Sequence, residues 1–303
     1  MDEKENKILL PSGEEVSIDE AGKVLRHSEK KVEDRSYVPV ILKRNDESIR
    51  HPYDTLVKAI HEGGKQHERS KSSLFLSAMA AGLILGFAAM SVAIVSQLVP
   101  PSVDPMLERL AMAFVYPLGF IICIMSGTQL FTEQTATAVF PVLDKKKTIS
   151  SLLILWVVVL GGNLFGTLCS SFLISLAENV IHAKEGFIEV AHHITSFSAL
   201  EIFISAILAG WLMAQGGWLI LATSPGTSQL ICIYIVTFII GLGGLHHSIA
   251  GSAEVFSGMI YSNTISFASC LKFLSSSVLG NLIGGAFFVA TLNYGHIKKA
   301  QIN

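Results

Sequence analysis

The sequence predicts an all-α membrane protein in which six transmembrane helices form two inverted three-helix repeats, with the second and fifth helices broken. Composition is the first reason: half of the 303 residues are hydrophobic and 15% are charged, whereas a soluble domain carries about 25% charged residues. The other reasons are six long apolar segments and two motifs that recur at one spacing. A net charge of −2 leaves no basic footprint for nucleic acid, so the expected surroundings are a lipid bilayer.

The start of the chain differs from the rest. Of the 22 Lys and Arg residues, 14 lie within residues 1–73. Pro52 suits a first helical turn, and Leu56, Ala59 and Ile60 then follow helical spacing, which favours an amphipathic helix lying along the membrane surface. The expected organisation is a flexible cytosolic tail over residues 1–50, a surface helix over 51–68 and a six-span channel domain over 69–303.

Six apolar segments follow, and each is long enough to cross about 30 Å of hydrocarbon at about 1.5 Å per residue. The spacing of apolar residues places them at residues 74–98, 107–130, 149–177, 199–222, 228–246 and 270–294.

Two of these segments are interrupted by glycines and polar residues. The second runs into a polar stretch at residues 127–133, and the fifth ends in Gly243-Gly244-Leu245-His246-His247. An ionisable group at membrane depth costs roughly 2.5 kcal/mol or more, and backbone can stop being helical there only where it lines a cavity or packs against protein. Broken helices of this kind indicate the binding site of a channel or transporter.

The two halves of the chain carry matching motifs. Phe120-Ile121-Ile122 recurs as Phe238-Ile239-Ile240, and Gly162-Asn163-Leu164-Phe165-Gly166 recurs as Gly280-Asn281-Leu282-Ile283-Gly284, each 118 residues later. This offset covers three predicted helices, so the second copy enters the membrane from the opposite side. The pattern predicts an inverted repeat in which the glycines allow close helix packing and the asparagines bond across the contact.

The distribution of Lys and Arg predicts the orientation. With a cytoplasmic N-terminus, the inner side holds the 14 early residues together with Lys145–Lys147 and Lys298–Lys299. The outer side then holds only Arg109, Lys184 and Lys272. We therefore expect a multi-pass membrane protein with both termini in the cytoplasm.

Four motifs resemble those of the formate/nitrite transporter family. They are Pro52-Tyr53-Asp54, Leu130-Phe131-Thr132 after Gly127, His247-Ser248-Ile249-Ala250 and Gly280-Asn281-Leu282-Ile283-Gly284-Gly285. The long charged tail and the doubled histidine are similar to the divergent YfdC-like branch of that family. The resemblance covers roughly residues 52–294 and implies an aquaporin-like homopentamer with one pore through each protomer, which carries small monovalent anions or their acids.

The resemblance also implies a substrate pathway. His247 would lie between two apolar constrictions and hydrogen-bond to Thr132, and its ordinary pKa of about 6.5 suits proton donation to an arriving anion. The other expected pathway residues are Leu130, Phe131, Phe120, Tyr116 and Ile240. Three further residues beside the breaks are candidates for a proton relay: His246, Glu133 and Glu254.

Two functions remain open. The first is a passive or proton-coupled channel for formate, nitrite or a similar monocarboxylate. The second is a channel of the same architecture for a cation or neutral solute, or a non-transporting membrane sensor. The reason is that Glu133 and Glu254 adjoin the breaks and no Lys or Arg lies near them along the chain to compensate their charge. We expect neither an enzyme nor a cofactor or metal, since no nucleophile arrangement, phosphate loop or metal-ligand spacing occurs.

Overall fold

The computed structural model describes residues 7–9, 15–17, 50–100 and 102–300. Two short strands, β1 (Lys7–Leu9) and β2 (Glu15–Ser17), pair in antiparallel register with Ile8 opposite Val16. Of the expected flexible tail, residues 1–6, 10–14 and 18–49 lie outside the described residues.

From residue 50 onward the described chain is helical. In chain order its elements are α3 (Pro52–Glu68), α4 (Lys71–Leu98), α5 (Pro105–Val115), α6 (Pro117–Met125), α7 (Phe131–Thr137), α8 (Phe140–Leu143), α9 (Ile149–Leu176), α10 (Glu178–Ile181), α11 (Lys184–Thr195), α12 (Ala199–Ala222), α13 (Thr227–Leu242), α14 (Ser248–Tyr261), α15 (Phe267–Ile283), the π-helix η2 (Gly284–Thr291) and α16 (Leu292–Lys299).

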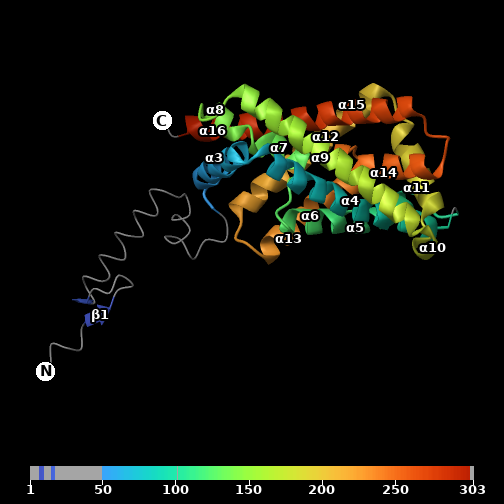
Figure 1. Ribbon diagram of the computed structural model, residues 1–303, viewed down its shortest axis with the longest axis horizontal. Coiled ribbons are helices and arrows are strands. Elements are labelled where there is room, and N and C mark those ends of the chain that lie inside the picture. Colours follow the sequence, from blue (N-terminus) through green and yellow to red (C-terminus); the bar gives the residue numbers. More distant parts are fainter. Residues whose placement is uncertain (1–6, 10–14, 18–49, 101, 301–303) are drawn as a thin grey trace.

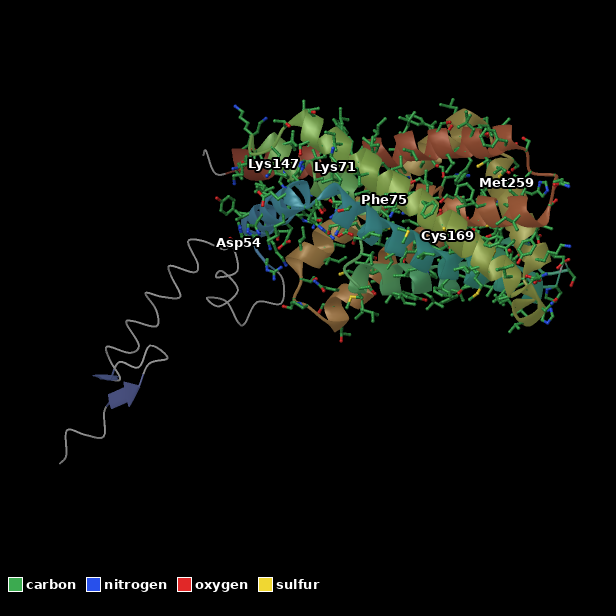
Figure 2. All side chains as sticks on the ribbon, in the orientation of Figure 1. Asp54, Lys71, Phe75, Lys147, Cys169 and Met259 are labelled. Carbon is green, nitrogen blue, oxygen red and sulfur yellow. The ribbon has the colours of Figure 1, made fainter. Side chains whose placement is uncertain are left out.

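The helices form one elongated bundle with two distinct ends (Figure 1). Helices α3, α8 and α16 gather at the end that we name the terminal end, and α10 and α11 lie at the opposite end, which we name the α11 end. Asp54, Lys71 and Lys147 mark the terminal end in Figure 2. Large apolar side chains such as Val157, at 70% exposure, cover the outside of the bundle between the ends, as lipid contact requires.

The structure confirms an all-helical body with several membrane-spanning helices. Among the described residues, five helices are long and apolar enough to cross a membrane: 71–98, 105–125, 149–176, 199–222 and 267–299. The sixth expected span, residues 228–246, corresponds to the shorter helix α13, which ends at Leu242. Both predicted breaks are present, because the chain leaves helical geometry between Met125 and Phe131 and again between Leu242 and Ser248.

Glycines bring the long helices together in two pairs. A Cβ atom added at Gly166 of α9 would collide with the backbone carbonyl oxygen of Met79 in α4. One added at Gly284, which follows α15, would collide with the carbonyl oxygen of Ile207 in α12. The helix axes can therefore approach this closely only because side chains are absent at these positions.

Helix α3 packs across the terminal end. Leu56, Ala59 and Ile60 are buried, as the helical spacing predicts. His67, in its last turn, reaches the Ala138 carbonyl oxygen through Nε2 at 2.9 Å and the Ser151 hydroxyl through Nδ1 at 2.7 Å. Burial lowers the pKa of His67, so a neutral imidazole ties α3 to the bundle. Whether α3 lies along a membrane surface stays a prediction.

Candidate functional site

The first break is held by a buried asparagine of α9. The Asn163 side-chain oxygen accepts the backbone N–H of Phe131 at 2.8 Å, and its amide nitrogen donates to the carbonyls of Ala78 at 2.8 Å and Gln129 at 2.9 Å. Gly127 precedes the break with a φ of +68°, a conformation that glycine adopts without steric cost. Asn163 therefore fixes the point at which α7 begins.

An asparagine of α15 holds the second break with the same set of bonds. The Asn281 side-chain oxygen accepts the backbone N–H of Ser248 at 2.8 Å, and its amide nitrogen donates to the carbonyls of Ala206 at 2.8 Å and His246 at 3.1 Å. Gly244 precedes this break with a φ of +58°. Both asparagines belong to the recurring motifs and bond across helix contacts, as those motifs predict.

His247 and Thr132 meet where the two broken helices begin. His247 is the N-cap of α14, and its Nδ1 accepts the backbone N–H of Ala250 at 3.2 Å. Because Nδ1 accepts a hydrogen bond, we assign the ring proton to Nε2, which lies 2.9 Å from the Thr132 hydroxyl oxygen. The exposed fractions are 1% for His247 and 0% for Thr132. His247 and Thr132, which the family resemblance predicts to pair, are therefore in direct contact.

The other predicted pathway residues surround this pair. The Phe120 ring lies edge-on to the His247 ring at a centroid distance of 5.0 Å, and the Tyr116 ring lies 5.1 Å from Phe120. The remaining three, Leu130, Phe131 and Ile240, are at most 1% exposed. The result is a polar contact enclosed by apolar and aromatic side chains.

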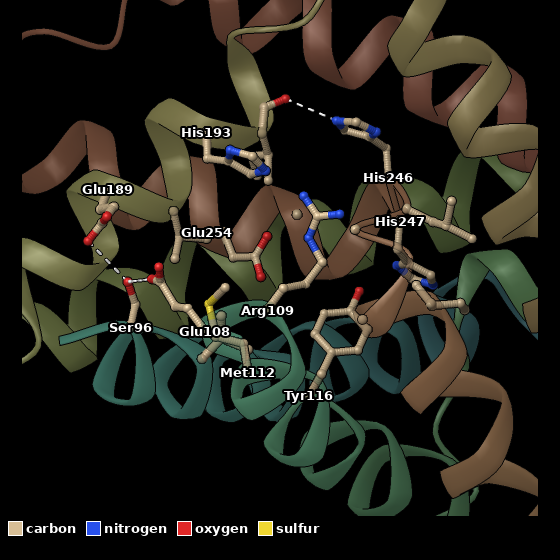
Figure 3. A pocket seen from close by; sticks show the side chains of 18 of the residues that line it. Ser96, Glu108, Arg109, Met112, Tyr116, Glu189, His193, His246, His247 and Glu254 are labelled. Atoms are coloured by element: carbon tan, nitrogen blue, oxygen red, sulfur yellow. Dashed lines mark hydrogen bonds between the residues drawn. The ribbon is translucent and has the colours of Figure 1, made fainter. Parts of the chain in front are cut away.

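A cavity of about 210 Å³ extends from His247 toward the α11 end (Figure 3). Tyr116 and Ile240 line it together with His247 and are buried, whereas Glu189, at the far side, is exposed. Leu130, Phe131, Thr132 and Phe120 are not among the described residues that line it. The cavity therefore stops at His247.

The cavity also holds a cation. Arg109, from α5, lines it together with Glu254 of α14, although no ion pair joins the two side chains in the described part of the chain. Charges counted near the breaks along the chain do not include Arg109, because α5 brings it to the second break from more than 100 residues away in sequence. Desolvation lowers the pKa of His193 on the facing helix α11, and the positive charge of Arg109 adds to this effect.

Two more carboxylates lie in the cavity wall. Glu108 and Glu189 both contact the Ser96 hydroxyl, at 3.3 Å and 3.1 Å. Neither carboxylate was among the site residues expected from the sequence, and Arg109 counted there only as an outer-side charge. The available signal was the charged pair Glu108-Arg109 within the opening turns of an otherwise apolar span.

The remaining relay candidates have different surroundings. The ring of His246 contacts the Ser205 hydroxyl through Nδ1 at 2.9 Å and the Ile194 carbonyl oxygen through Nε2 at 3.2 Å. Glu133 lies in the first turn of α7, where its side chain packs beside Gly217. His246 lines the cavity, and Glu133 is not among the described residues that do.

Comparison with known proteins places this arrangement in context. A family model described as formate/nitrite transporter matches residues 53–295. The inner membrane protein YfdC of Escherichia coli K12 is 32% identical over 257 residues, which cover 81% of this chain and 80% of that protein.

Two solved structures share the fold. An FNT family ion channel superposes with a TM-score of 0.74 at 20% identity, and the match covers 81% of this chain and 99% of that one. A pentameric formate channel with formate bound gives a TM-score of 0.62 at 22% identity and covers 76% and 98%.

Proposed function

Because this chain belongs to the formate/nitrite transporter family, we propose that it carries small monovalent anions, or their neutral acids, across the bacterial inner membrane. Formate, nitrite and similar monocarboxylates are the substrate class, by analogy with the family and with the formate-bound channel of the same fold. The observation that carries the proposal is the His247–Thr132 contact at the closed end of a cavity that opens toward the α11 end.

The surroundings of His247 favour passage of a neutral acid. Buried aromatic and aliphatic side chains enclose the histidine, and moving a bare ion into such a place costs far more than moving a neutral molecule. A weak acid can cross in its protonated form. His247 supplies a hydrogen-bond donor at the narrow point, and the positive end of the α14 helix dipole begins there, which favours an anion over a cation on arrival.

The architecture that we propose for this function is a pair of inverted three-helix repeats. Matching asparagine bonds at Asn163 and Asn281, and matching left-handed glycines at Gly127 and Gly244, support it. Lys and Arg at the terminal end support a cytoplasmic location for both termini, with the α11 end outside. The pentameric neighbour supports a homopentamer.

We assign Glu254 to proton movement on the cavity side of His247. Glu133 and His246 complete the proposed relay set. The two hydrogen bonds of the His246 ring favour a positioning role, because one neutral tautomer satisfies both: Nε2 donates to Ile194, and Nδ1 accepts from Ser205.

Flux measurements test this function. Proteoliposomes that contain the full chain should take up labelled formate and nitrite, with little chloride or potassium movement, and the formate rate should rise as external pH falls, because more substrate enters as the acid. The measurement compares the four ions at pH 5.5 and 7.5. A potassium-selective current with no formate uptake would contradict the proposal.

The second candidate is a cation channel of the same architecture. One observation favours it: three carboxylates, those of Glu108, Glu189 and Glu254, line the cavity beside the single guanidinium of Arg109 among the described residues. A surplus of carboxylates attracts cations. The potassium arm of the flux measurement separates the two candidates.

Removing the N-terminal tail should leave transport close to normal. The described helical body begins at Arg50, whose backbone N–H donates to the Ala222 carbonyl at 2.8 Å and whose guanidinium also donates to the Leu221 carbonyl. A deletion of residues 2–49 keeps this anchor. We expect formate flux within about twofold of the full chain. Size-exclusion chromatography should show one oligomer peak that is smaller only by the deleted residues, and loss of assembled protein would make the tail a structural part of the channel.

A further inference from the structure

Arg109 presents an open guanidinium to the cavity. Arg109 is in the second turn of α5 and packs against the second break. A Cβ atom added at Gly244 would be 3.6 Å from the Cζ atom of Arg109. Within residues 50–100 and 102–300, no side chain or backbone group forms a hydrogen bond or ion pair with it. Its donors are therefore available to a ligand, and the planar guanidinium binds carboxylates through two parallel hydrogen bonds.

Glu254 enters the same cavity from α14. Its side chain is 6% exposed, and its carboxyl group, like the Arg109 guanidinium, points into the open space in Figure 3. No hydrogen bond to this carboxyl group is found in the described part of the chain. A carboxylate at this burial is costly unless it is protonated or paired with a cation.

We propose that Arg109 and Glu254 form a carboxylate-capture site, in which Arg109 binds the substrate anion and Glu254 gives it the proton with which it moves on toward His247. This inference rests on the proposed function. In the transfer step the O–H bond of the Glu254 carboxyl group breaks and a new O–H bond forms on the substrate carboxylate. The substrate becomes a neutral acid, Glu254 becomes a carboxylate, and water at the cavity mouth later returns the proton.

The transfer keeps the local charge constant. Before it, the Arg109 cation pairs with the substrate anion beside a neutral Glu254; after it, the same cation pairs with the Glu254 carboxylate beside a neutral acid. Arg109 stays charged throughout, so its change of partner releases the acid toward His247. No unpaired charge is created in a poorly hydrated space.

Other ionisable groups face Glu254 from the elements packed around it. Tyr116 and Glu108 approach from α5, Glu189 and His193 from α11, and His246 and His247 from the break. Ser96 of α4 lies between Glu108 and Glu189 and accounts for one contact of each. Glu254 differs from those two because it lies on α14, the helix that His247 caps, further from the exposed mouth.

Substitutions in the full chain separate the two roles. The variants are Arg109→Gln, Arg109→Lys and Glu254→Gln, and the controls are Lys184→Gln and Glu185→Gln, which remove exposed charges on α11 outside the cavity. Each is measured for formate uptake against formate concentration at several pH values, with a pH-sensitive dye inside the vesicles to follow proton entry.

We expect Arg109→Gln to raise the half-saturating formate concentration about tenfold or more, with a smaller rise for Arg109→Lys. Glu254→Gln should keep the half-saturating formate concentration within about twofold of the wild type, but should slow uptake and flatten the pH profile of uptake. Both controls should match the wild type.

An unchanged half-saturating formate concentration in Arg109→Gln, or a wild-type pH profile in Glu254→Gln, would overturn the capture site while leaving the transport function intact. Wild-type vesicles that take up no formate would instead overturn the proposed function itself. If Arg109→Gln does not assemble, the half-saturation of Arg109→Lys decides the point.

Discussion

His247→Phe should reduce formate flux about ten- to a hundredfold while the protein still assembles. The substitution removes a buried ring nitrogen that contacts Thr132 at 2.9 Å and places a further apolar side chain among the five that surround the pair. A hydrogen bond to a charged or developing partner contributes about 1.5–3 kcal/mol, and each 1.36 kcal/mol changes a rate about tenfold. The measurement is labelled formate uptake per assembled protein in proteoliposomes.

Two further variants separate the transport role of His247 from its structural role. His247→Asn can still cap α14, because its side-chain oxygen can take the place of Nδ1 as the acceptor for the Ala250 N–H, but it has no group that reaches the Nε2 position. His247→Gln places an amide near Nε2 and loses the cap. We expect His247→Asn to keep wild-type thermal stability and lose flux; full flux in this variant would remove the distal ring nitrogen from the mechanism.

The helical spans were predictable because apolar length is a local property. The span expected at residues 199–222 matches α12 residue for residue. Both breaks were predictable from glycine and polar residues in apolar surroundings, and the family resemblance was confirmed by the match over residues 53–295. The π-helical turn η2 was not predictable, since its residues, 284–291, continue an apolar helical pattern.

The site was predictable only in part, because its contacts depend on tertiary structure. His247 and Thr132 are 115 residues apart in the chain, and only the family motifs connected them. The neighbouring histidines point to different places: His246 contacts Ser205 and Ile194, whereas His247 contacts Thr132. An extended backbone at His247, with φ −96° and ψ 122°, sends successive side chains in opposite directions.

Arg109 shows most clearly what the sequence leaves open. Its position in the cavity depends on which face of α5 turns toward α14, and helix rotation is decided by packing against neighbours. A charge count assigns it to the outer side, but cannot distinguish a surface residue from one that points inward. The assignment of anion or cation preference changes with that single rotation.

Asn281→Leu should destabilise the fold more than any surface substitution of similar size. Asn281 is fully buried and makes three hydrogen bonds that hold the second break. The leucine leaves the Ser248 N–H and the His246 carbonyl oxygen without partners, and each unsatisfied buried group costs about 1–3 kcal/mol. A loss of about 2–6 kcal/mol is a large share of the about 5–15 kcal/mol that stabilises a typical protein. The measurement is the thermal unfolding midpoint of the purified full chain.

Asn163→Leu should have a similar effect, because Asn163 makes the equivalent bonds at the first break. Ser275→Ala is the matched control: it lies on the same helix as Asn281, faces outward, and bonds only to carbonyls of its own helix. We expect the control to unfold at the wild-type temperature.

If Asn281→Leu also unfolded at the wild-type temperature and kept full flux, the asparagines would not hold the breaks. Another interaction would then have to hold His247, which directly precedes Ser248, in its position. If both asparagine variants fail together, the two halves depend on the same kind of bond, which is the behaviour that an inverted repeat predicts.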